Sequence, residues 1–124
     1  MSKIVTAMNA MISNPDLITD VTQGAMESEI FFKYDSKYIW SLIVDDTSGT
    51  YILHYYPYAK SVSSIASIPE DRWPEADITS VFYNSKVLGT KEALDTFKEL
   101  HSILNEKVYG MDDVLNDIIG QGQF

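Results

Sequence analysis

The sequence predicts an α+β fold in which helices flank an antiparallel sheet of about four strands. Two observations predict this class. Apolar residues recur at helical spacing near both ends of the chain, and they alternate with a period of two between residues 29 and 56. A chain of 124 residues has the size of one domain. We therefore expect 1–124 to form a single α+β domain, with 120–124 as a frayed tail.

The N-terminal segment is expected to contain two helices. The first is indicated by apolar residues that share one helical face, namely Ile4, Val5, Met8, Met11 and Ile12. Asn14 and Pro15 interrupt this pattern, and they suit the cap and the first turn of a second helix. The second helix would bury Leu17, Ile18, Val21 and Ala25.

The central segment is expected to form a three-strand meander. Apolar and aromatic side chains alternate with other side chains over 30–34, 38–44 and 51–56, and turn-forming residues separate these runs. Residues 59–68 are compatible with either a short helix or irregular backbone, because serines interrupt their apolar spacing. Prolines predict a loop over 69–77, and a fourth strand is expected at 78–83.

The C-terminal part is expected to form one long helix and one short helix. Thr90 suits the cap of a helix over residues 91–108, which Gly110 would close. The short helix begins at Asp112, and we expect its apolar side to face the core through Val114, Leu115, Ile118 and Ile119.

The net charge of the chain restricts the classes of molecule that it is expected to bind. Nine Lys and Arg against eighteen Asp and Glu give a net charge of −9, which opposes direct binding to nucleic acid and to anionic membranes. No run of residues is long and apolar enough for a membrane span, and no signal peptide is visible. The sequence thus favours a cytoplasmic protein with a basic protein partner, although solubility alone also explains the acidity.

No pattern of residues predicts an enzyme. Cysteine is absent, which excludes thiol catalysis and thiolate metal sites. The two histidines, His54 and His101, are far apart in the sequence, and no nucleophile motif or glycine-rich phosphate loop is present. We therefore expect no catalytic residue, no cofactor and no metal.

The candidate partner-binding residues are acidic or aromatic. Trp73 lies on a proline-stiffened acidic loop, where it suits an interface anchor within a negative rim, or alternatively a side chain that pins the loop to the body. Asp45 and Asp46 suit the same negative surface, or alternatively the chemistry of their turn. The predicted set is Glu70, Asp71, Trp73, Glu75, Asp77, Asp45, Asp46 and Tyr56.

Three functional hypotheses are compatible with these features. The leading one is a non-enzymatic acidic module that masks a basic partner, by analogy with the size and charge of immunity proteins, antitoxins and phage inhibitors of bacterial defence. The second is a homodimeric acidic chaperone of the secretion type. The third is a small-ligand sensor or enzyme, with a pocket between the sheet and the long helix lined by Tyr55, Phe97 and His101.

Overall fold

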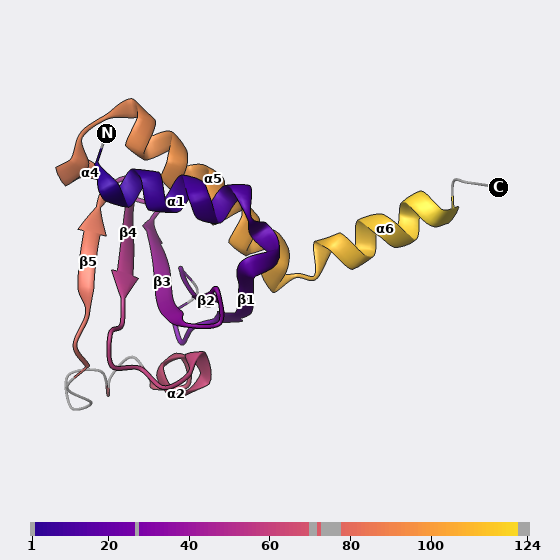
Figure 1. Ribbon diagram of the computed structural model, residues 1–124, viewed down its shortest axis with the longest axis horizontal. Coiled ribbons are helices and arrows are strands. Elements are labelled where there is room, and N and C mark those ends of the chain that lie inside the picture. The colour runs from indigo at the N-terminus through magenta and orange to yellow at the C-terminus, as the bar shows by residue number, and fades with distance from the viewer. Residues whose placement is uncertain (1, 27, 70–71, 73–77, 122–124) are drawn as a thin grey trace.

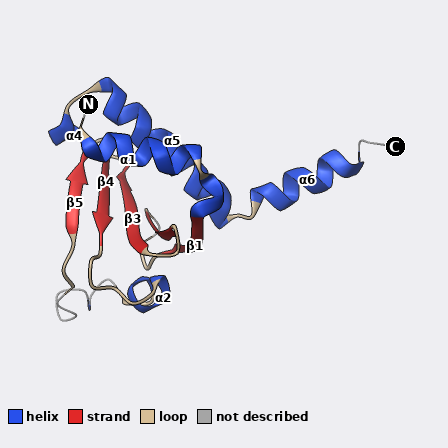
Figure 2. Cartoon of the chain, viewed as in Figure 1, coloured by secondary structure: helices blue, strands red, loops and turns tan. Residues whose placement is uncertain are grey.

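The computed structural model describes residues 2–26, 28–69, 72 and 78–121, and it confirms the α+β class (Figures 1 and 2). Five antiparallel strands pair in chain order: β1 Ile18–Gln23, β2 Glu29–Tyr34, β3 Tyr38–Asp45, β4 Thr50–Tyr55 and β5 Val81–Asn84. The helices are α1 Lys3–Ser13, a 3₁₀ turn η1 Pro15–Leu17, α2 Val62–Ala66, α4 Ser85–Leu88, α5 Lys91–Val108 and α6 Met111–Gln121. The predicted meander is β2–β3–β4.

Helices α1 and α5 lie side by side and cover one face of the sheet (Figure 1). Their buried side chains meet Phe32, Leu42 and Leu53 from the central strands, which are closed to solvent. Both helix starts are capped as their sequences favour, since the hydroxyl of Ser2 accepts from the Val5 amide and that of Thr90 from the Ala93 amide. This layer is the main core.

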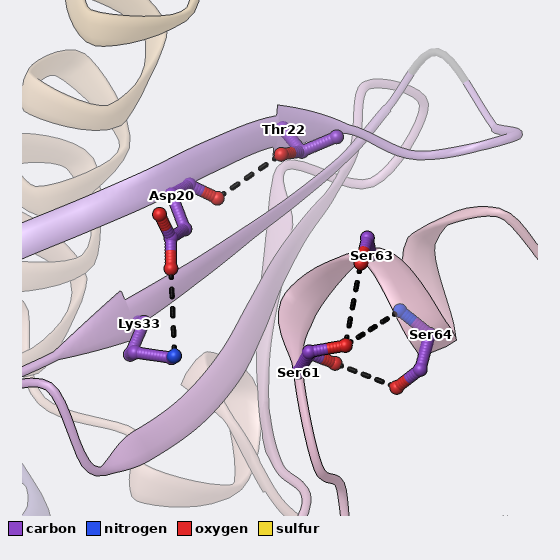
Figure 3. A network of polar contacts seen from close by, with 6 residues as sticks. All are labelled: Asp20, Thr22, Lys33, Ser61, Ser63 and Ser64. Carbon is purple, nitrogen blue, oxygen red and sulfur yellow. Dashed lines mark hydrogen bonds and ion pairs between the residues drawn. The ribbon is translucent and has the colours of Figure 1, made fainter.

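The described residues cover the other face of the sheet only in part. The short helix α2 packs against this face, and its Val62 and Ile65 lie in a smaller cluster with Phe31 and Ile39. One of the serines that interrupt the apolar spacing of this segment caps the helix: the Ser61 hydroxyl accepts from the Ser64 amide at 3.1 Å (Figure 3). The face beyond α2 contains the half-buried Ile43, Ile52 and His54.

The predicted second N-terminal helix is wrong. Only Pro15–Leu17 is helical, as a single 3₁₀ turn, and the chain then enters β1. The spacing of Ile18 and Val21 resembles a helical period because β1 contains a bulge, at which Asp20 has a φ of 55° and the register with β2 shifts. Asp20 also forms an ion pair with Lys33 on β2 at 3.5 Å (Figure 3).

The fourth predicted strand exists, but it lies later in the chain than expected. It covers Val81–Asn84 rather than 78–83, and it forms the edge of the sheet beside β4. Asn84 then caps α4, because its side-chain oxygen accepts from the Lys86 amide at 2.8 Å.

The inward orientation predicted for the last helix is also wrong. The long helix ends as expected, with Gly110 at a φ of 61°, and α6 then points away from the sheet (Figure 1). Its large apolar side chains are 45–58% exposed, namely Val114, Leu115, Ile118 and Ile119. The amphipathic spacing correctly predicted a helix, but it did not identify the surface against which the helix packs.

Among the described residues, no helix is both long and apolar enough to cross a membrane.

Candidate functional site

The predicted acidic loop lies outside the described residues. This applies to Glu70, Asp71, Trp73, Glu75 and Asp77. Their role as an anchor with a negative rim stays a prediction.

The remaining predicted partner-binding residues lie in two different environments. Asp45 and Asp46 are exposed at the β3–β4 turn, and the Asp45 carboxylate accepts from the Thr47 amide at 3.0 Å. Asp45 therefore stabilises its own turn while facing solvent. Tyr56, in contrast, is only 4% exposed and packs against Phe31. Because its side chain is buried, Tyr56 offers almost no surface to a protein partner.

Helix α6 presents an apolar stripe to solvent. The helical spacing of Val114, Leu115, Ile118 and Ile119 places them on one side of the helix. Asp113 and Asp117, one turn apart, are exposed on the same helix, which carries no Lys, Arg or His. A helix with this arrangement can place its apolar side in a groove while its carboxylates contact the rim.

An acidic hollow lies at the base of α6. It has a volume of about 390 Å³, and its lining residues come from η1, the end of α5 and the start of α6. Among the described residues that line it are three acids, Asp16, Glu106 and Asp113, and one basic residue, Lys107. We call this hollow together with the apolar stripe, Asp113 and Asp117 the α6 surface.

A second hollow, of about 530 Å³, lies between the sheet and α5. Its lining includes His101 from the second half of α5, Tyr109 at the C-cap of this helix and Asp46 from the β3–β4 turn. Burial lowers the pKa of His101, although the Asp46 carboxylate opposes this shift. Of the three residues predicted for a pocket near this position, only His101 lines this hollow. Phe97 is closed to solvent, and Tyr55 packs against Trp40.

A chain of buried hydrogen bonds crosses the partly covered face of the sheet. The Ser41 hydroxyl donates to the Glu29 carboxylate at 2.9 Å, and it lies 2.7 Å from the Tyr56 hydroxyl. Ser41 has one hydroxyl proton, so Tyr56 donates to Ser41. Burial raises the pKa of Glu29, and the hydrogen bond from Ser41 only partly offsets this shift.

Sequence reasoning missed both α6 as an exposed surface and Glu29 as a buried acid. The available signal for α6 was the combination of an amphipathic period with aspartates and no basic residue. For Glu29 no local signal exists, because a Glu at the start of a strand is ordinarily solvated.

No group of three or more His, Asp or Glu among the described residues could hold a metal ion. No protein-family model, curated protein or solved structure matches the chain.

Proposed function

We propose that this chain is a non-enzymatic acidic module that masks a basic protein partner, as immunity proteins, antitoxins and anti-defence inhibitors do. The observation that carries the proposal is the apolar stripe of α6, which is exposed next to carboxylates on a chain of net charge −9. Exposed apolar patches of this kind are typical of interaction sites. The described structure contains no surface that covers this stripe.

Charge complementarity favours a basic partner. Coulomb attraction would steer such a partner towards the α6 surface, and burial of the stripe would then hold it. Asp113 and Asp117 disfavour close pairing of α6 with α6 of a second copy, because like charges would be brought together. Asp45 and Asp46 are exposed in the β3–β4 turn, and Asp46 lines a hollow together with Tyr109 at the C-cap of α5. Their carboxylates add to the negative electrostatic field near the α6 surface.

The test compares the wild type with a double variant, Leu115→Ala with Ile118→Ala. Both residues are exposed and alanine favours helix, so the fold should not change. Val87→Ala is the matched control, since Val87 is 84% exposed on α4, at the other end of the molecule (Figure 1). Each immobilised protein is incubated with lysate of the cells that encode the chain, and the retained proteins are identified, purified and titrated.

The proposal predicts a basic protein that the wild type and Val87→Ala bind equally and that the double variant binds at least about tenfold more weakly. Retention of no basic protein, or equal binding by all three, would contradict it. Light scattering is a second readout. A dimer that the double variant dissociates would assign the α6 surface to a second copy, as the chaperone alternative requires.

A further inference from the structure

The partly covered face of the sheet contains a hollow that the proposed function does not use. It has a volume of about 270 Å³, close to the lower end of the range for small-molecule sites. Strands β2, β3 and β4 form its floor, and residues 26, 78 and 80 complete its wall. The lining residues are Met26, Glu29, Ile43, His54, Tyr56, Ile78 and Ser80.

The charge in this hollow lacks a counter-ion among the described residues. Glu29 is 5% exposed, and its one hydrogen bond with a described side chain comes from Ser41 through a single carboxylate oxygen. The ion pairs formed by the described residues join Lys33 to Asp20 and Lys37 to Asp35, so neither includes Glu29. Burial of a carboxylate costs free energy, and a cation that pairs with the carboxylate offsets this cost.

The walls of the hollow suit the body of an organic cation. The rings of His54 and Tyr56 are nearly parallel, with an interplanar angle of 12° and centroids 6.1 Å apart. Burial lowers the pKa of His54 from its ordinary value of 6.5, which favours the neutral imidazole at neutral pH, and a neutral ring does not repel a cation. Aromatic faces attract ammonium groups, and Ile43 and Ile78 supply apolar contacts. His54 is held by Ser80, with Nδ1 and Oγ 3.3 Å apart.

We propose that this hollow binds a small organic ammonium ion, with its charged group at the Glu29 carboxylate and its apolar body between Ile43, Ile78 and the ring of His54. The Ser41–Tyr56 hydrogen bonds fix the position of the carboxylate. An adjoining hollow of about 360 Å³ shares Tyr56 and Ile78 and extends towards α2, so the site can accept a longer apolar body. This site lies apart from the α6 surface and does not depend on the proposed partner.

The experiment uses phenethylammonium as the probe and 2-phenylethanol as its neutral match. Binding to the full chain is followed through the NMR signals of residues 43, 54 and 80. We expect the ammonium to bind about tenfold more tightly than the alcohol, because a hydrogen bond to a charged group is worth more than a neutral one. Glu29→Gln should abolish this preference, while Glu92→Gln, an exposed carboxylate, should keep it.

Glu29→Gln preserves an acceptor for Ser41, so loss of folding is not expected, and its melting curve verifies this. The proposal is overturned if the probe causes no saturable shifts at these residues. It is equally overturned if the alcohol binds as tightly as the ammonium, or if Glu29→Gln keeps the preference. None of these three results bears on the α6 surface, because Leu115 and Ile118 are not part of this hollow.

Discussion

At the residue scale, single positions carry strain or buried charge that the alternating sequence pattern does not reveal. Asp35 and Ser36 have φ values of 54° and 57°, and the Lys37 amide donates to the Tyr34 carbonyl. Both central residues of this turn between β2 and β3 therefore have the positive φ that a type I′ turn requires. The left-handed region is costly for side chains other than Gly and, to a lesser degree, Asn and Asp.

Ser36→Gly should therefore stabilise the protein by about 0.5–1 kcal/mol, because glycine relieves the left-handed strain at this turn. Chemical denaturation of the two proteins measures the difference. Thr47→Gly is the control, since Thr47 is exposed in the next turn without a positive φ. At position 47, glycine raises the conformational entropy of the unfolded chain and should therefore destabilise the fold. A Ser36→Gly protein that is no more stable than the wild type would contradict the assigned turn.

The burial of Glu29 predicts how the stability of the fold changes with pH. Burial raises its folded-state pKa above the ordinary value of 4.5, so the folded protein holds the Glu29 proton more tightly than the unfolded chain does. The group contributes most to stability below pH 4.5, and this contribution is lost as the pH rises through the raised value. Glu29→Gln is neutral at every pH. The free energy of unfolding of the variant, relative to that of the wild type, should therefore increase from pH 4 to pH 7. Denaturant unfolding at several pH values measures it. If the unfolding free energies of the two proteins change in parallel with pH, the burial of this carboxyl group is refuted.

At the element scale, the long helix and the meander were predictable because their patterns are regular and extend over many residues. Thr90 and Gly110 bound the long helix as expected, and the alternation of β2, β3 and β4 is continuous. Strand β1 was not predictable by periodicity, because its bulge replaces the period of two with a spacing of three. Its β-branched residues, Ile18, Thr19, Val21 and Thr22, were the local signal that favoured a strand.

The site was less predictable than the fold. An amphipathic helix has the same pattern whether its apolar side meets the core or a partner, so the sequence could not distinguish these outcomes for α6. The apolar residues of α5 are buried against α1 and the sheet, whereas those of α6 have no such neighbour among the described residues.

Removal of α6 should leave the fold intact, because the helix contributes no residue to either buried cluster. We expect a chain that ends at Gly110 to change the free energy of unfolding by less than about 1 kcal/mol. Circular dichroism and denaturant titration measure this. Truncation within α5 before Leu104, which is closed to solvent, provides the contrast and should unfold the protein. Collapse of the chain that ends at Gly110 would mean that α6 is structural.

At the scale of the whole molecule, carboxylates and an exposed apolar stripe lie together at the end of the domain that carries α6. Asp16, Glu106 and Asp113 line one hollow at the base of α6, and Asp46 lines another beside Tyr109. The segment 86–107 contains four Lys and four acids, so the net charge of −9 arises from the rest of the chain. Association with a basic partner should consequently depend on ionic strength.

The salt dependence distinguishes charge steering from apolar docking. Raising the ionic strength should lower the association rate constant with the basic partner and leave the dissociation rate constant nearly unchanged, because screening acts on the approach of charged surfaces. Surface plasmon resonance at several salt concentrations measures both rate constants. An association rate constant that does not depend on salt would show that the acidic field has no part in recognition.

The most direct test of the central claim is an NMR titration of the full chain with the captured basic partner. Our account predicts that the largest amide shifts fall within residues 103–121 and that Asp16 shifts with them, whereas β5 and α4 are unaffected. Binding accompanied by unchanged signals over Met111–Gln121 would contradict the assignment of α6 as the recognition element.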